Sequence, residues 1–260
     1  MLTLIDFNYL PAFLLIFARL IAFVATVPIF SYKNIPNQFK IGLAFFISLI
    51  VVTTLDIPAL PIDLTFILLL FKEVMVGLTI GLIATLILTI VQIAGGFIDF
   101  QMGFAIANVM DPQTGAQSPI IGQYFYTFAL LFIFAIDGHH LLINGTIASF
   151  NFVEIDQLIN FSSQSYITAV MVMFSQMFLI AFQMAIPIVG SLFLVDVALG
   201  IIARTVPQLN VFVVGIPLKI TVSFLAISIY IIFYISIVRR LFGYMLEVMD
   251  SFMRILGGML

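Results

Sequence analysis

The sequence has no cysteine and no tryptophan, and few of its residues are charged. Without cysteine the chain has no disulfide, no thiolate nucleophile and no cysteine-ligated metal site. Charged residues make up 8% of the chain and hydrophobic residues 63%, whereas soluble domains have about 25% and about 45–50%. The net charge is −3 and no basic run is present, which argues against nucleic-acid binding. The composition therefore predicts an integral membrane protein.

The sequence also lacks the short motifs of common catalytic and nucleotide-binding sites. It contains no GxSxG, GxGxxG, P-loop or HExxH pattern. An intramembrane enzyme would need a paired nucleophile and base, and the sequence displays no such pair. His139 and His140 are adjacent and diverge on a regular helix, so neither a metal site nor a cofactor is expected. These absences favour passage or assembly over catalysis.

Long apolar runs predict an all-α membrane protein of about six helices arranged as long hairpins. The expected helices cover residues 9–30, 41–55, 64–94, 124–143, 166–204 and 211–238. The third and fifth would be about 46 and about 58 Å long, well beyond a hydrocarbon core of about 30 Å. From Leu241 onward, apolar residues at helical spacing predict a separate amphipathic helix over 241–260, on a membrane surface or against a partner.

Ionisable residues inside these apolar runs need neighbours other than lipid. Arg19 would cost at least about 2.5 kcal/mol in the bilayer centre, so it either snorkels or pairs with a neighbouring carboxylate, or it forms a pore or subunit contact. Lys72 and Glu73 are adjacent and do not face each other on a helix, so each is expected to need its own partner unless one of them faces water. The candidate intramembrane or subunit-contact charges are Arg19, Lys72, Glu73, Asp137, Asp196, Arg204 and Lys219.

Two further patterns concern helix contacts and turns. The spacing of Gly77 and Gly81 lets two helices approach closely. Residues 95–123 form the longest interval in which glycines, amides, carboxylates and prolines are spread throughout, with an Asp-Pro turn at Asp111. Its many Phe, Met and Ile residues are too apolar for a solvated loop. We therefore expect a central non-helical loop that lies against protein or inside a cavity.

The positive-inside rule conflicts with six ordinary spans. The connector with Lys33 and Lys40 and the connector after Arg204 would share the cytoplasmic side, and the tail after Arg239 and Arg240 would then lie opposite. Either one apolar segment is re-entrant, or the helices are not ordinary lipid-facing spans. The over-long helices and the buried charges favour the second alternative.

Three ordered motifs carry a resemblance to a known family. The first motif runs from Gln101–Phe104 through 109–112 to Gly115. The second covers 135–139, and the third covers 200–212 together with 215–219. On these motifs, essentially the whole chain resembles the FliR family, the export-gate family that flagella share with type III injectisomes.

The resemblance implies a core component of the flagellar type III protein export gate. Such a protein forms with FliP and FliQ a gated pore for unfolded flagellar subunits, works with FlhB and FlhA, and catalyses no reaction. It implies a multi-pass protein of the bacterial inner membrane, in the flagellar basal body. It also implies a FliP-like part over 1–165 and a FliQ-like hairpin over 166–240.

The resemblance further implies two local roles. The pore plug would comprise Met110, Asp111, Pro112, Gln113, Thr114, Gly115 and Pro119. The hairpin turn with Pro207 and Asn210, beside Arg204, would lie at the cytoplasm-facing end; Asn210 is also a candidate N-cap. An injectisome gate homologue is one alternative function. A secondary transporter or channel is another, and it predicts inverted repeats that the sequence does not display.

Overall fold

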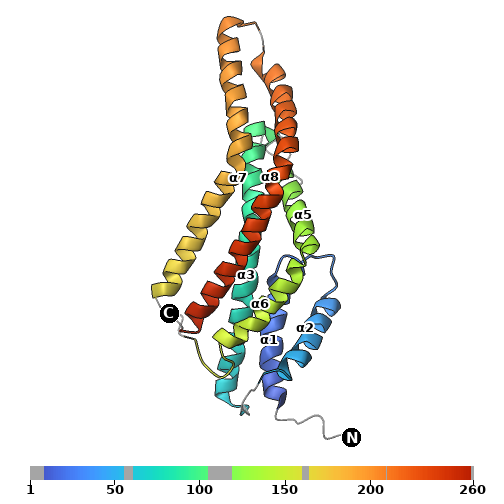
Figure 1. Cartoon of the computed structure of the whole chain (residues 1–260), viewed down its shortest axis with the longest axis vertical. Helices are drawn as coiled ribbons and strands as arrows, with labels where there is room; N and C mark the ends of the chain where they lie inside the picture. The colour runs from blue at the N-terminus through green and yellow to red at the C-terminus, as the bar shows by residue number, and fades with distance from the viewer. Residues whose placement is uncertain (1–8, 56–60, 105–118, 160–163, 209, 259–260) are drawn as a thin grey trace. The chain divides into compact units, whose positions relative to one another are not determined.

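The computed structural model describes residues 9–55, 61–104, 119–159, 164–208 and 210–258. The helices in this part of the chain (Figure 1) are α1 (Leu10–Thr26), α2 (Asn37–Val52), α3 (Leu64–Met102), α5 (Ile120–Ala135), α6 (Gly138–Phe152), α7 (Gln164–Thr205) and α8 (Val211–Leu256). Turns and short irregular segments join them, and the described residues include no strand. The predicted all-α class is confirmed.

Several helices have the length and composition of membrane spans. By these criteria α3, α7 and α8 can each cross a membrane, and α5 with α6 would add a fourth span across a short break. The helices α1 and α2 are apolar but shorter, at 17 and 16 residues. With 39, 42 and 46 residues, α3, α7 and α8 are longer than the roughly 20 residues a bilayer core requires.

The bounds expected for the central loop, residues 95–123, were too wide at both ends. α3 continues to Met102, so residues 95–102 are helical, and α5 begins at Ile120. A glycine inside a helix costs up to about 1 kcal/mol, which makes Gly95 look like a helix end in the sequence. In the structure Gly95 lets α3 pack closely against α5, because a Cβ at Gly95 would lie 2.1 Å from the Cα of Gly122.

The single helix expected over 124–143 is two helices. α5 ends at Ala135 and α6 begins at Gly138, with Asp137 between them in the left-handed region at φ 54°. Apolar residues resume at Leu141, four positions after Asp137, so a hydropathy pattern averages across this break.

The C-terminal tail is part of α8 and packs inside the chain. The expectation of a separate helix over 241–260 was wrong, because α8 runs through Arg239 and Arg240 to Leu256. The apolar face of the tail meets α6 and the start of α7. A Cβ at Gly145 would lie 3.8 Å from the Met249 side chain, and the rings of Tyr166 and Phe252 are 5.8 Å apart. Neither a membrane surface nor a partner is needed to cover this face.

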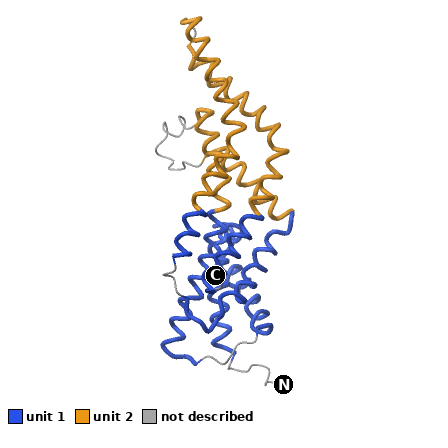
Figure 2. Tube along the Cα trace, turned by 60° about the vertical axis from the view of Figure 1, so that its left-hand side comes forward, with its two compact units in different colours: residues 1–86, 136–173, 243–260 blue, residues 87–135, 174–242 orange. Residues whose placement is uncertain are grey.

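Backbone contacts divide the chain into two compact units (Figure 2). Unit 1 consists of residues 1–86, 136–173 and 243–260, and unit 2 of residues 87–135 and 174–242. Each unit therefore joins segments that are far apart in the sequence. The division into parts 1–165 and 166–240, which rests on resemblance, stays a prediction.

Unit 1 has an apolar core built from α1, α2, α3, α6 and the segment after α6. Its buried members are Leu15, Ile16, Leu20, Ala44, Val51, Phe66, Leu69, Phe150 and Ile155. The charged cluster described next lies beside this core.

Candidate functional site

Arg19 of α1 is fully buried in unit 1, and each nitrogen of its guanidinium group has a partner. Nε donates to Glu73 Oε2 at 2.5 Å, and Nη2 donates to Glu73 Oε1 at 2.9 Å. Nη1 donates to Ser149 Oγ at 2.9 Å, and Nη2 also donates to the Val153 carbonyl oxygen at 2.8 Å. The guanidinium carbon lies 3.8 Å from the centroid of the Phe150 ring, close enough for a cation–π contact. Of the two interpretations of Arg19, pairing with a carboxylate is the one observed.

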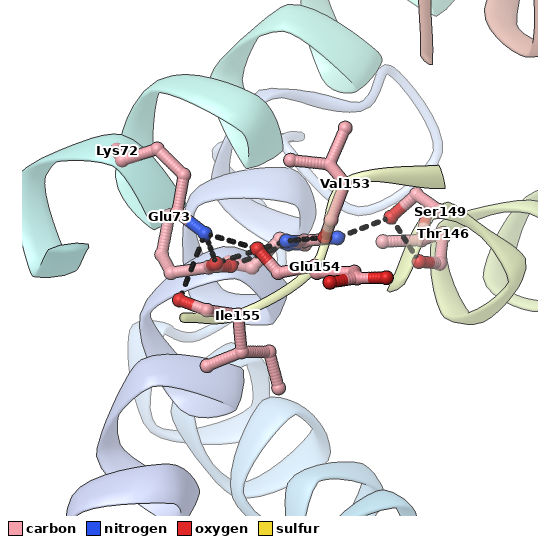
Figure 3. A network of polar contacts seen from close by, with 8 residues as sticks. Lys72, Glu73, Thr146, Ser149, Val153, Glu154 and Ile155 are labelled. Atoms are coloured by element: carbon pink, nitrogen blue, oxygen red, sulfur yellow. Dashed lines mark hydrogen bonds and ion pairs between the residues drawn. The ribbon is translucent and has the colours of Figure 1, made fainter. Parts of the chain in front are cut away.

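Lys72 completes the cluster on the other side of Glu73 (Figure 3). Its Nζ lies 2.5 Å from Glu73 Oε1 and donates to the carbonyl oxygens of Glu154 and Ile155 at 2.7 and 3.0 Å. The expectation that the adjacent Lys72 and Glu73 would not pair was wrong. Their Cβ atoms diverge on the helix, but the four-carbon stem of lysine is long and flexible enough to bring Nζ back to the carboxylate.

The cluster brings two basic side chains, Arg19 and Lys72, to the one buried carboxylate of Glu73. Backbone carbonyl oxygens of Val153, Glu154 and Ile155 accept hydrogen bonds from these cations. Those carbonyls follow the end of α6, where no regular helix would satisfy them. Removing one partner of a buried ion pair leaves an uncompensated charge at a cost of about 3–5 kcal/mol. The cluster therefore determines that α1, α3 and the segment after α6 come together.

Gly77 and Gly81 on α3 lie against α1 next to this cluster. A Cβ at Gly77 would lie 2.2 Å from the Arg19 carbonyl oxygen, and one at Gly81 would lie 1.8 Å from Thr26 Oγ1. The Thr85 hydroxyl also donates to the Thr26 carbonyl oxygen at 3.0 Å. The close approach predicted for this spacing is confirmed, and it joins α3 to α1 within the chain.

Unit 2 contains a second polar cluster, which links three helices. Lys219 of α8 lies with Nζ 2.5 Å from Asp196 Oδ1 on α7. Gln101 of α3 donates from Nε2 to Asp196 Oδ2 at 2.8 Å, and its carbonyl oxygen accepts from Lys219 at 3.4 Å. The Lys219 and Asp196 side chains are 20% and 37% exposed. These charges compensate each other and still face the surroundings of unit 2.

The helices α3 and α5 are clamped together where they flank the undescribed residues 105–118. Asp99 is buried, and its carboxylate accepts from the Ile121 backbone N–H at 3.0 and 3.3 Å, in the first turn of α5. Pro119 is half-buried next to Gly96, where a Cβ would lie 3.5 Å from the proline ring. Sequence reasoning did not assign Asp99 this capping contact, because no spacing rule links a carboxylate to a backbone N–H 22 positions later in the chain.

Of the predicted plug residues, the described part of the chain includes Pro119. The other plug candidates, Met110, Asp111, Pro112, Gln113, Thr114 and Gly115, lie outside the described residues.

The turn between α7 and α8 is exposed. Asn210 Oδ1 accepts from the Phe212 and Val213 N–H groups at 3.1 and 3.4 Å, so the predicted N-cap is confirmed. Arg204 and Pro207 are exposed, and Phe212 is 78% exposed. The most apolar windows of α7 and α8 are each 22% buried, whereas that of α3 is 56% buried. The hairpin therefore presents a large apolar surface that its own chain does not cover.

The structure does not gather the sequence-predicted charges into one site. Arg19, Lys72 and Glu73 meet in unit 1, and Asp196 meets Lys219 in unit 2. Arg204 is exposed near the hairpin turn, and Asp137 is exposed at the start of α6.

The chain is similar to known bacterial export proteins. Residues 10–245 match the family described as bacterial export proteins, family 1. The flagellar biosynthetic protein FliR of Bacillus subtilis (strain 168) is 52% identical over 95% of this chain and 96% of its own length. FliR of Pectobacterium carotovorum subsp. carotovorum is 30% identical over 85% and 84% of the two chains. The Yop proteins translocation protein T of Yersinia pestis is 32% identical over 66% and 67%. The chain thus belongs to the bacterial export proteins, family 1, together with the FliR proteins.

Proposed function

We propose that the chain is a core component of the flagellar type III protein export gate. With FliP and FliQ subunits it forms a gated pore for unfolded flagellar subunits, next to FlhB and FlhA, in the inner membrane at the flagellar basal body. It catalyses no reaction. The flagellar relative supports the flagellar assignment over the injectisome one, because it is 52% identical over 95% of the chain, against 32% over 66% for the Yop translocation protein.

The uncovered surface of the hairpin is the observation that carries this proposal. Large apolar side chains such as Phe193, Leu194 and Phe212 are 60–78% exposed on α7 and α8. Lipid alone would suit them, but Asp196, Lys219 and Arg204 lie on the same two helices and are partly or fully exposed. An ionised side chain in the middle of a bilayer costs about 2.5 kcal/mol or more. Neighbouring protein helices satisfy both kinds of residue.

The charges divide into two roles under this proposal. Arg19, Lys72 and Glu73 hold unit 1 together from within, since all three are at most 3% exposed. The exposed or partly exposed Asp196, Arg204 and Lys219 contact other subunits. The FliP-like character of 1–165 and the FliQ-like character of 166–240 belong to the same proposal, with the turn at Pro207 and Asn210 toward the cytoplasm.

Co-purification tests the assembly. A tagged chain should recover several copies of two other hydrophobic proteins from the membrane, and a strain without the chain should build no filament. A chain recovered alone, or as a homo-oligomer that binds a small solute, would contradict the proposal and favour a transporter.

The pore plug is the second part of the proposal. Residues 110–115 and Pro119 would close the pore, and the clamp of Asp99 on α5 supports it by fixing the ends of α3 and α5 next to that segment. Deleting residues 110–115 should make the membrane leaky to ions and leave the complex assembled. Unchanged conductance in an assembled deletion variant would refute the plug role.

A further inference from the structure

We propose that Asp137, His139 and His140 form a binding site for one divalent transition-metal ion, with Zn²⁺ as the ion that fits best. These residues offer one ligand atom each, and the three atoms lie within 4.8 Å of one another. The ring centroids of His139 and His140 are 4.2 Å apart, with an angle of 40° between the planes. Adjacent histidines diverge along a regular helix, but these two are in the first turn of α6, where their rings come together.

The backbone of Asp137 is the second observation. Among the described residues it is the one non-glycine residue with a positive φ, at φ 54° and ψ 26°. A non-glycine residue held in this region is strained, and such strain clusters at functional sites. Glycine would serve better at this position if only a change of chain direction were required.

The side chain of Asp137 also does not cap the helix that it precedes. Asp137 occupies the N-cap of α6, yet its carboxylate makes no capping hydrogen bond. An aspartate at this position normally accepts from the first-turn N–H groups and stabilises the helix. The left-handed backbone instead keeps the carboxylate among the two imidazoles, within the 4.8 Å set. Its conformation is therefore unfavourable for the helix and favourable for a ligand set.

The donor set is one that zinc commonly uses. Two imidazole nitrogens and one carboxylate oxygen bind Zn²⁺ at about 2.0–2.2 Å and leave a fourth position for water. Asp137 and His140 are exposed and His139 is half-buried, so an ion can enter and two of the side chains can adjust to it. Imidazole also suits Cu²⁺ and Ni²⁺, which makes these ions the competitors to compare.

Metal titration of the full-length protein, purified in detergent with its partner subunits and stripped with a chelator, tests the site. We expect about one Zn²⁺ per chain, and a visible Co²⁺ spectrum typical of a tetrahedral nitrogen and oxygen site. His140→Ala and Asp137→Asn should each weaken binding at least tenfold. Asparagine tolerates the left-handed region, so Asp137→Asn retains the backbone and removes the charged ligand. Asp156→Asn, at an exposed acid elsewhere in unit 1, is the matched control and should bind like the unchanged protein.

Asp137→Gly separates a ligand from a turn residue. It relieves the backbone strain, so the protein should be at least as stable while Zn²⁺ binding falls at least tenfold. Retained binding in Asp137→Gly, or equal affinity in His140→Ala and the control, would overturn the proposal. Substoichiometric Zn²⁺ would do the same, and none of these readouts depends on export activity.

Discussion

The guanidinium of Arg19 and the carboxylate of Glu73 form a two-pronged ion pair, with Nε on Oε2 at 2.5 Å and Nη2 on Oε1 at 2.9 Å. The two residues are 54 positions apart, and both side chains are 0% exposed. The planar fork of arginine matches a carboxylate in this arrangement, which a lysine cannot reproduce. The pair therefore joins α1 to α3 with a defined orientation.

Replacing Glu73 should be among the most damaging single changes in unit 1. Glu73→Gln leaves Arg19 and Lys72 buried without a counter-charge, and breaking a buried pair costs about 3–5 kcal/mol. Thermal unfolding in detergent should show a large loss of stability. Glu154→Gln changes an exposed carboxylate next to the cluster and should have little effect. Equal melting temperatures for the two variants would contradict this role of Glu73.

The contact of α3 with α1 should not tolerate a methyl group at Gly77. In Gly77→Ala the new Cβ meets the Arg19 carbonyl oxygen, which is backbone, so the helices must separate at a cost of about 1–3 kcal/mol. Gly42→Ala in α2 is the matched control, since nothing lies within 4 Å of a Cβ there. The control should gain up to about 1 kcal/mol from helix propensity. Melting temperatures that shift in the same direction would show that this contact is not tight.

The carboxylate of Asp63 gives the start of α3 a pH dependence. The Thr65 hydroxyl and the Phe66 and Thr65 N–H groups donate to it, and these hydrogen bonds lower the pKa of Asp63 below its usual value. Its stabilising effect is therefore present above the unfolded-state pKa of about 3.9 and is lost as the pH falls through the lower folded-state pKa.

Two substitutions at Asp63 isolate this effect. Asp63→Ala should lower the melting temperature at pH 7, because the cap is lost. Asp63→Asn retains an acceptor oxygen and has no carboxylate to titrate. The difference in melting temperature between the unchanged protein and Asp63→Asn should therefore shrink below about pH 4. If the difference in melting temperature did not change with pH, titration of the Asp63 carboxylate would not contribute to stability.

Arg204 should matter for assembly more than for folding. It is exposed near the hairpin turn, so Arg204→Ala should leave the melting temperature of the isolated chain nearly unchanged. Recovery of the complex by co-purification should fall. Lys33→Ala, at another exposed cation, is the control. Normal recovery with Arg204→Ala would remove this residue from the proposed subunit contacts.

The pair of Asp196 and Lys219 can be tested by exchanging the charges. Asp196→Lys alone places two cations together and should weaken the contact of α7 with α8. The double variant Asp196→Lys with Lys219→Asp restores opposite charges and should recover part of the lost stability. A double variant no better than the single one would show that the pair does not couple, which is common for exposed ion pairs.

Composition and periodicity predicted most of the secondary structure. The long helices, the hairpin turn with its Asn210 cap and the glycine contact at Gly77 all appear where the pattern indicated. Residues 95–102 were misassigned because glycine weakens a helix locally, and tertiary packing of Gly95 against Gly122 compensates. The break at Asp137 was not predicted, because the apolar run resumes at Leu141 and hydropathy averages across the short polar segment.

The sequence by itself determined the class of protein, the family motifs and the need of Arg19 for a partner, because hydropathy, motif order and the cost of a buried charge are local properties. Only the tertiary structure decided that the partner is Glu73, that Lys72 shares it, and that the carbonyls after α6 complete the cluster. The contacts of Arg19 join residues 54 to 134 positions apart. No residue pattern encodes such distances, since they depend on how the helices pack.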